Sequence, residues 1–271
     1  MERIGTVDGA QVVVHSTGQG PGIVVVHGGG VTIDQYRRLA AALADRFTVH
    51  LYNRRGRADA PPRIEPYSAD QEVDDLSAVL AHTGAHNVIG HSAGGFFALQ
   101  AALRLPIARL ALYDGAVSVN SNFPTDWLPA ARAAARSGDT ALAMALTSAG
   151  INTQSAATRL PLRAQVAICK LFLRTPIGRD MGSLLEMTLD ESEQIRLHDG
   201  PPEQWAGVTA EVLLACGGSG PSYYVRNNED LARAMPHARS LVVPRCGHDA
   251  INRAPHRLVE PLAEFFTAGR D

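Results

Sequence analysis

Residues 87–95 read Asn-Val-Ile-Gly-His-Ser-Ala-Gly-Gly and join two different kinds of local pattern. Asn87–Gly90 predicts a very short strand, and the alanine- and leucine-rich run Ala93–Leu105 predicts a helix. Between them, Gly90–Gly94 satisfies the pattern G-x-S-x-G. In that pattern the serine occupies a strained strand-to-helix turn, its Oγ projects above the sheet, and the next N–H points at a reacting carbonyl oxygen. Ser92 is therefore the candidate nucleophile.

Runs that predict strands and helices alternate on both sides of this turn. Short apolar or β-branched runs predict further strands at Gln11–Ser16, Ile23–Val26, Phe47–Tyr52, Arg109–Tyr113, Glu211–Cys216 and Ser240–Val243. Apolar residues at helical spacing predict helices at Ile33–Leu43, Val73–Leu80, Tyr223–Met235 and Leu258–Phe266, the second one behind a capping box of Ser68 and Gln71. Apolar strands that alternate with helices are typical of an α/β fold, in which helices cover both faces of a parallel sheet.

The alternation breaks in the segment from about Ser121 to Trp205, where no convincing strand occurs. Amphipathic or apolar runs in this segment predict helices at Asp126–Arg136, Thr140–Ser148, Arg163–Arg174 and Met181–Leu189. A helical insertion in an α/β sheet is most simply a lid over the carboxyl ends of the strands, where such folds bind ligands. We therefore expect a core domain made of residues 1–120 and 206–271, with a helical lid at 121–205.

A glycine-rich segment, His27-Gly28-Gly29-Gly30, directly follows the predicted strand Ile23–Val26. Glycines allow bare backbone N–H groups to approach an oxyanion, and such preorganised donors often contribute most to the electrostatics of acyl transfer. A plain glycine turn or a phosphate-binding loop would be alternatives. Neither a G-x-G-x-x-G pattern nor a P-loop lysine is present, which favours an oxyanion loop.

His248 lies in the segment Gly247-His248-Asp249, just beyond the last predicted strand. From there an imidazole can reach over the sheet edge toward Ser92, and its near-neutral pKa lets it act first as a base and then as an acid. The chain has ten histidines, so a surface histidine is the alternative. His27 and His91 belong to backbone motifs and are expected to support loops.

These segments, together with Asn53–Arg57, resemble the α/β-hydrolase superfamily, specifically its serine-nucleophile branch with a helical lid. They occur in the family order, and the resemblance covers nearly the whole chain, being weakest at 121–205. The resemblance implies an eight-stranded, mostly parallel sheet, a Ser–His–acid triad and no cofactor. It also implies oxyanion donors from the backbones of Gly29 and Ala93, and a structural role for the arginine-rich turn.

The third triad member departs from the usual pattern of the family. Its acid usually follows the strand here predicted at Glu211–Cys216, but Gly220 occupies that position. Some members instead carry the acid at the end of the preceding strand, where this chain has Asp114, and that choice keeps the order Ser, Asp, His. An aspartate before Gly115 could also cap a turn. We predict Asp114 as the acid, with three rivals: Asp249, Glu229 and Asp230.

The expected reaction is hydrolysis of an ester, thioester or lactone through an acyl-enzyme on Ser92, with His248 as general base. A serine at this turn argues against the dehalogenases and epoxide hydrolases that use an aspartate nucleophile. Carbon–carbon bond hydrolysis or acyl transfer on the same triad stays open, as does a ligand-binding, lyase or cyclase role, because fold does not determine function. Phe123 and Trp127 are candidate pocket residues.

Composition narrows the classes of partner. The 271 residues are 45% hydrophobic and 19% charged, which is ordinary for a globular enzyme, and a net charge of −2 gives no basis for nucleic-acid binding. No signal peptide is visible, and the longest uncharged apolar stretch is too short to cross a bilayer. Three widely spaced cysteines favour a reducing compartment and no metal site. We expect a cytoplasmic protein with a small-molecule substrate and no membrane or nucleic-acid partner; its oligomeric state is open.

Overall fold

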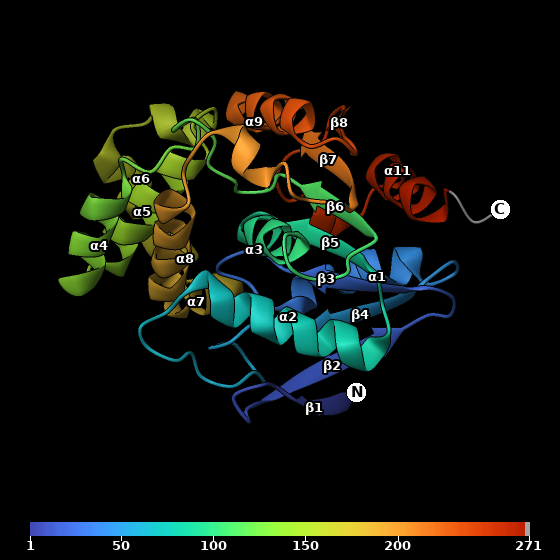
Figure 1. Ribbon diagram of the computed structural model, residues 1–271. Coiled ribbons are helices and arrows are strands. Elements are labelled where there is room, and N and C mark those ends of the chain that lie inside the picture. Colours follow the sequence, from blue (N-terminus) through green and yellow to red (C-terminus); the bar gives the residue numbers. More distant parts are fainter. Residues whose placement is uncertain (269–271) are drawn as a thin grey trace.

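Eight strands form one sheet in the computed structural model, which describes residues 1–268 (Figure 1). The order across the sheet is β1-β2-β4-β3-β5-β6-β7-β8. The strands are β1 (Glu2–Gly5), β2 (Gln11–Thr17), β3 (Gly22–Val26), β4 (Thr48–Tyr52), β5 (Asn87–His91), β6 (Arg109–Tyr113), β7 (Glu211–Gly217) and β8 (Ala238–Val243). Strands β1 and β2 pair antiparallel and β2 runs antiparallel to β4, whereas all other neighbours are parallel. The predicted mostly parallel α/β sheet is thus confirmed.

The edge strand β1 has no counterpart among the strands predicted from local patterns, although the family resemblance implied an eighth strand. Its four residues bury one apolar side chain, Ile4, so no alternation marks the segment as a strand. The pairing of β1 with β2, with Ile4 opposite Val12, is a tertiary contact that a short window cannot reveal.

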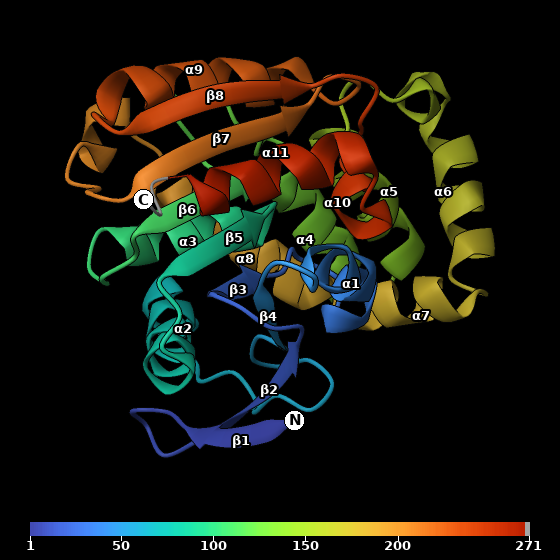
Figure 2. The same cartoon turned by 90° about the vertical axis from the view of Figure 1, so that its right-hand side faces the viewer.

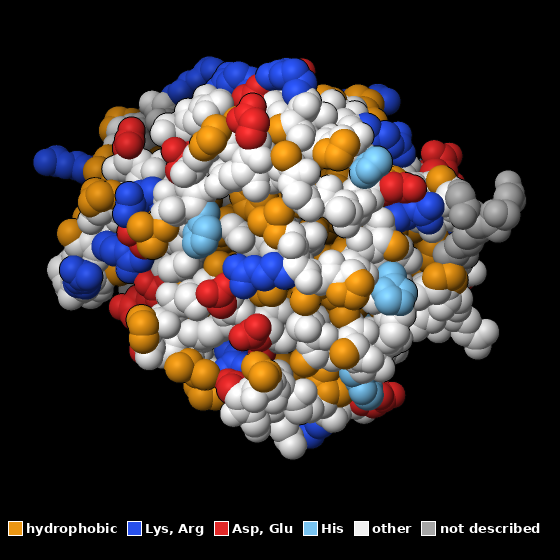
Figure 3. Space-filling view, in the orientation of Figure 1, with side chains coloured by type: hydrophobic (Ala, Val, Ile, Leu, Met, Phe, Trp, Pro, Cys, Tyr) orange, Lys and Arg blue, Asp and Glu red, His pale blue; other side chains and the backbone are white. Residues whose placement is uncertain are grey.

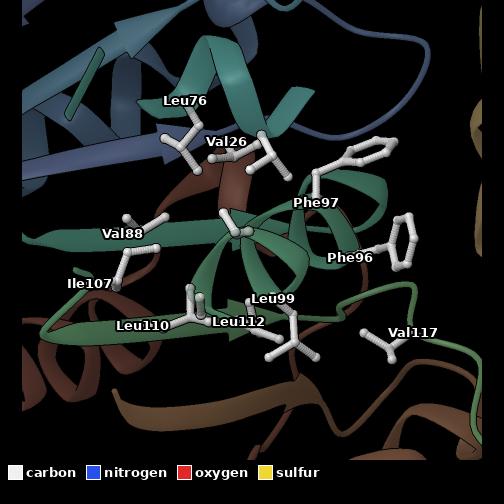
Figure 4. Close-up of a cluster of buried hydrophobic side chains, with 14 of the residues drawn as sticks. Val26, Leu76, Val88, Phe96, Phe97, Leu99, Ile107, Leu110, Leu112 and Val117 are labelled. Atoms are coloured by element: carbon white, nitrogen blue, oxygen red, sulfur yellow. The ribbon is translucent and has the colours of Figure 1, made fainter. Parts of the chain in front are cut away.

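Two apolar clusters, one on each face, hold the helices against the sheet. One face is covered by α2 (Ala69–Thr83), α3 (Ala93–Ala102) and α9 (Ser222–Ala234), and the other by α1 (Arg37–Leu43), α10 (Ala250–Arg253) and α11 (His256–Thr267) (Figure 2). Alternate residues of β3 serve the two faces, with Val24 and Val26 in the first cluster and Ile23 and Val25 in the second. Figure 4 shows the first cluster around α3, a helix whose ten residues are all buried. Each large apolar side chain buried in this way contributes about 1.5–3 kcal/mol.

The capping box expected at the start of α2 is not formed. Ser68 is the residue before the helix, but its side chain makes no capping hydrogen bond. The Gln71 amide instead bonds the backbone of Ile64 and Pro66 in the preceding loop. Because the Gln71 side chain is bonded to the backbone of this loop, it cannot also reach back to the helix N-terminus, and the capping box does not form.

Between β6 and β7 the described chain contains helices and no strand. They are α4 (Leu128–Arg136), α5 (Thr140–Ile151), α6 (Leu162–Phe172), α7 (Pro176–Ser183) and α8 (Leu185–Leu197), with short 3₁₀ turns at Ala156–Arg159 and Pro202–Trp205. The single helix predicted at Met181–Leu189 is wrong, because α7 and α8 meet at Leu184, where the chain leaves helical geometry (φ −94°, ψ 5°). None of the helices in the described chain is long and apolar enough to cross a bilayer.

The helices of this segment differ sharply in how deeply they are packed. Helix α8 contacts α3 and α4, and it buries the side chains of Leu185, Leu189, Glu191, Ser192 and Ile195. Helix α6 has no buried residue, and Figure 2 shows it at the outer edge of the molecule. The structure therefore separates an inner helix that is part of the packed interior from an outer helix that is not.

We expect α6, which has no buried residue, to open to solvent more readily than the buried α8. Amides of α8 should exchange with solvent as slowly as those of α3, while amides of α6 should exchange much faster, because opening α6 exposes little apolar surface. Hydrogen–deuterium exchange with mass spectrometry measures both helices in one experiment. Equal protection of α6 and α8 would contradict the division.

Candidate active site

Ser92 occupies a strained turn between β5 and α3. Its φ of 53° and ψ of −125° lie in a region that residues with a Cβ rarely adopt. The turn depends on close backbone approach, because a Cβ added at Gly94 would lie 2.2 Å from the carbonyl oxygen of Val26. A Cβ at Gly90 would likewise lie 2.7 Å from the Cα of Gly95. The glycines of the motif are therefore steric requirements of the turn that presents Ser92.

Asp114 and His248 meet beside this turn. Asp114 directly follows β6 and is fully buried, and its Oδ2 lies 3.0 Å from Nδ1 of His248. Its other oxygen, Oδ1, accepts a hydrogen bond of 2.9 Å from the backbone N–H of Gly217. The carboxylate is thus held at both oxygens, and it fixes the His248 tautomer with the proton on Nδ1, which leaves Nε2 as the acceptor.

The His248 ring also contacts two other rings. The ring of Tyr224 stacks on it at 5.8 Å with an interplanar angle of 10°, and the ring of His91 lies 4.6 Å away. His248 and Ser92 both line one cavity of about 390 Å³. Ser92 Oγ and His248 make no mutual hydrogen bond among the described contacts, and in unliganded sites such bonds tighten only when substrate binds.

The cavity is mainly apolar, and helices α5 to α8 form much of its wall. Its apolar lining comes largely from α5, α6, α7 and α8: Met144, Ile151, Ile168, Cys169, Phe172, Met181, Leu185 and Ile195. Phe123 also lines the cavity. Trp127 does not, which corrects the expectation from sequence: its indole packs against Gly150 and donates to the carbonyl oxygen of Pro124 at 2.9 Å.

The backbone N–H groups of Gly29 and Ala93, two residues that line this cavity, have no protein acceptor among the described hydrogen bonds. The neighbouring N–H of Gly28 is already bonded, because it donates to the Tyr36 hydroxyl at 2.8 Å. The arrangement leaves Gly29 and Ala93, the two predicted donors, available to a substrate oxygen.

A chain of hydrogen bonds connects the glycine loop, the segment His27-Gly28-Gly29-Gly30 after β3, to the His248 backbone. The carbonyl oxygen of His248 can only accept, so His91 donates to it from Nε2 at 3.2 Å. In a neutral ring Nδ1 is then the acceptor, and the Tyr36 hydroxyl, which itself accepts from Gly28, donates to it at 2.6 Å. Burial, reinforced by the nearby His248, lowers the pKa of His91 well below its usual value, so its ring is neutral as this chain requires.

Arg54 holds the same glycine loop from its other side. Its fully buried guanidinium donates to the carbonyl oxygens of His27 at 3.0 Å and Gly28 at 3.1 Å. It also pairs with Glu72 of α2 at 2.9 Å and with Glu191 of α8 at 3.1 Å. Arg54 therefore connects the glycine loop to α2 and to α8. We call the helices α4–α8, between β6 and β7, the inserted segment.

Glu191 is the point where α8 joins this buried cluster. Arg57 and Arg63 both donate to its Oε1, and a Cβ added at Gly29 would lie 2.8 Å from its Oε2. Burial alone would raise the pKa of the Glu191 carboxyl, but the three arginine charges outweigh burial and hold it well below its usual range. Glu191 lines the cavity as an ionised group whose oxygens are already bonded.

The rival acids lie elsewhere. The Asp249 carboxylate pairs with Arg253 at the surface, Asp230 pairs with Arg233, and Glu229 is exposed. Gly220, at the usual acid position, is close to Asp114: a Cβ added there would lie 3.8 Å from Asp114 Oδ2. The two acid positions of the family thus converge on one place in this structure.

Sequence reasoning missed Tyr36 and Glu191 as supports of the site. Tyr36 carried only the signal of an apolar helical position, and Glu191 lies beyond the helix predicted at Met181–Leu189. Arg54 was read correctly as structural, but its partners were not visible. A lone charge in a helix gives no signal of burial until its partners are in place.

The sheet order and the Asp114–His248 contact are those of the α/β-hydrolase class of proteins. A family model described as "Alpha/beta hydrolase family" matches residues 23–260, so the chain belongs to the α/β-hydrolase family. A solved α/β hydrolase from Sphaerobacter thermophilus superposes with a TM-score of 0.80 at 26% identity, covering 98% of this chain and 100% of that one.

Curated relatives match over a shorter stretch. The uncharacterized hydrolase YraK of Bacillus subtilis is 36% identical over 104 residues, which are 37% of this chain and 38% of that protein. A pimeloyl-(acyl-carrier protein) methyl ester esterase of Chromobacterium violaceum is 38% identical over 93 residues, or 34% of this chain and 35% of that protein. The matches therefore span only a little over a third of these relatives.

The neutral buried histidines should make stability depend on pH. Burial lowers the pKa of His27 and His91 in the folded chain, so below about pH 6.5 the unfolded chain binds more protons and the free energy of unfolding falls. Each such histidine adds up to about 1.4 kcal/mol per pH unit to this slope. Denaturant titrations between pH 7 and 5 should show a smaller slope for His91→Gln. The exposed control His237→Gln should keep the wild-type slope, and a wild-type slope in His91→Gln would refute the assignment.

Glu191 and Glu72 allow a matched test of loop positioning, because both pair with Arg54 and only Glu191 reaches the cavity. Each Glu→Gln change leaves buried cationic charge unpaired and should cost about 3–5 kcal/mol of stability. We expect Glu191→Gln also to lower kcat by about 10- to 100-fold, because it would displace Gly29, a predicted oxyanion donor, and small displacements of reacting groups are costly. Glu72→Gln should lose stability but keep kcat. Equal losses of kcat in the two variants would show that the effect is one of general stability.

Proposed function

We propose that this protein is a serine hydrolase that cleaves a carboxylic ester, thioester or lactone through an acyl-enzyme on Ser92. The observation that carries the proposal is the contact of 3.0 Å between the buried Asp114 and His248, which lines the same cavity as the strained Ser92. Chain membership of the α/β-hydrolase family supports hydrolysis, and the relatives named as methyl ester esterases support an ester.

In the proposed reaction, Nε2 of His248 accepts the proton of Ser92 Oγ as that oxygen attacks the substrate carbonyl. The carbonyl oxygen becomes negative and accepts hydrogen bonds from the N–H groups of Gly29 and Ala93. Collapse expels the leaving group, which takes the proton from His248. Water then attacks the acyl-enzyme by the same route, and its proton passes to His248 and back to Ser92. Asp114 stays ionised and stabilises the imidazolium in both halves.

The proposed substrate carries an apolar acyl group. The cavity wall is mostly aliphatic and aromatic, and the one charged side chain in it, Glu191, has both oxygens bonded to arginines. A volume of about 390 Å³ lies within the usual range for small-molecule sites. In this proposal the α4–α8 segment is the lid predicted at residues 121–205, with α8 as its fixed part and α6 as its outer part.

The triad makes a paired prediction. Ser92→Ala should abolish turnover of p-nitrophenyl esters and labelling by a fluorophosphonate probe, while the melting temperature stays near wild type because the turn is retained. Asp114→Asn should lower kcat by several orders of magnitude near neutral pH; loss of an orienting carboxylate costs about 10⁴-fold in serine proteases.

Asp249→Asn is the matched control, because it removes a carboxylate next to His248 that the structure pairs with Arg253 at the surface. It should keep normal rates. Labelling of a residue other than Ser92, or normal turnover in Asp114→Asn, would refute the proposed mechanism.

A further inference from the structure

The outer helices of the inserted segment expose an unusual amount of aliphatic surface. Eleven large hydrophobic side chains are exposed in the described chain, and five of them lie between residues 160 and 177: Leu160, Leu162, Ile168, Leu171 and Ile177. Leu171 and Ile177 are 66% and 58% exposed. Scattered exposed hydrophobic residues need no explanation, but a cluster of them marks an interaction site.

Positive charge surrounds these side chains. No aspartate or glutamate occurs between Asp139 and Asp180, whereas the same stretch carries five exposed cations: Arg159, Arg163, Lys170, Arg174 and Arg179. None of the five forms an ion pair with any residue that the structure describes. The whole chain has a net charge of −2, so this positive surface is local. We call residues 159–179 the cationic rim.

The cationic rim lies beside the cavity and at the edge of the molecule. Cys169 and Phe172 of α6 line the cavity, and Ile168 lines it while remaining 51% exposed. Lys170 and Leu171 of the same helix are exposed and do not line the cavity. Figure 2 shows α6 and α7 forming an outer edge. Figure 3 shows basic and hydrophobic side chains, with some acidic ones, along the left-hand edge, where α4–α6 lie in Figure 1.

We propose that the cationic rim docks on an anionic lipid bilayer, with the aliphatic side chains inserted at the level of the headgroups. Basic residues gain about fivefold in binding for each one held near an anionic membrane, and exposed aliphatic side chains add their transfer free energy. Because α6 and α7 lie at the outer edge of the molecule, they can contact a flat bilayer. The sequence predicted no membrane partner because it lacks a span, but peripheral docking needs none.

Other occupants fit the rim less well. A second copy of the chain would bring two positive surfaces together, which is unfavourable. Protein partners are usually anchored by tryptophan, tyrosine and arginine. The rim has arginines but neither tryptophan nor tyrosine, and its exposed apolar side chains are leucine and isoleucine. The proposal does not depend on the hydrolytic function proposed above.

Vesicle co-sedimentation of the full chain tests the proposal. We expect binding to vesicles that contain phosphatidylglycerol, little binding to pure phosphatidylcholine, and weakening by salt. Lys170→Gln/Arg174→Gln should weaken binding about 25-fold, and Leu171→Ser/Ile177→Ser about tenfold. The charge-matched control Arg226→Gln/Arg257→Gln, on α9 and α11, and the apolar control Val7→Ser should bind as wild type. Melting temperatures of all variants should stay close to wild type.

Three results would overturn the proposal. The first is no binding of the wild type to phosphatidylglycerol vesicles at low salt, or equal weakening by the charge-matched control. The second is a dimer in light scattering that Leu171→Ser/Ile177→Ser dissociates, with vesicle binding unchanged, which would make the rim a contact between copies. The third is equally tight binding to soluble polyglutamate that ignores Leu171→Ser/Ile177→Ser, which would indicate an acidic protein partner.

Discussion

The buried guanidinium of Arg54 is the contact on which the arrangement of the site depends. It follows β4, yet it bonds the backbone of the glycine loop after β3, a carboxylate of α2 and a carboxylate of α8. Removing a charged group from water is costly, and a fully buried arginine is tolerated only when its donors are bonded and its charge is matched. The glycine loop, the core helix and the inserted segment are thereby required to meet in one relative position.

Hydrogen bonds also hold the other side of the glycine loop. From Gly28 through Tyr36 and His91 to the His248 carbonyl oxygen, each group donates to the next, and this order of donors requires a neutral His91. The proposed oxyanion donors, nucleophile and base are therefore supported by groups that take no part in the proposed chemistry. Preorganisation of this kind is what makes electrostatic stabilisation effective in acyl transfer.

The helices of the inserted segment differ in how firmly they are packed against the rest of the protein. Helix α8 is held by a buried ion cluster and by apolar packing, whereas α6 has a cavity-facing side and an outward side that is both basic and aliphatic. If the cationic rim docks on a membrane as we propose, an apolar substrate could reach the cavity from the lipid phase past α6. The fixed α8 would keep the glycine loop in place while the outer helices adapt.

Sequence alone was sufficient for those features that local patterns encode. The strand–turn–helix around Ser92, the alternation of strands and helices and the helical character between β6 and β7 all follow from short-range periodicity and from glycine sterics. The position of His248 after the last strand could be predicted because the carboxyl ends of parallel strands converge at one edge. Asp114 was predicted from the family resemblance, since some members carry the acid after this strand.

Only the tertiary structure decided the features that rest on long-range pairing. These include the edge strand β1, the junction of α7 and α8, the burial of Glu191 among three arginines and the place of Trp127 outside the cavity. The acid shows the division most clearly. Residues 114 and 220 are far apart in sequence, and only the folded chain shows that a Cβ at Gly220 would lie within van der Waals contact of the Asp114 carboxylate, 3.8 Å away. A sequence pattern indicates local conformation and which residues share a face, whereas burial and charge compensation depend on which distant residues are brought together.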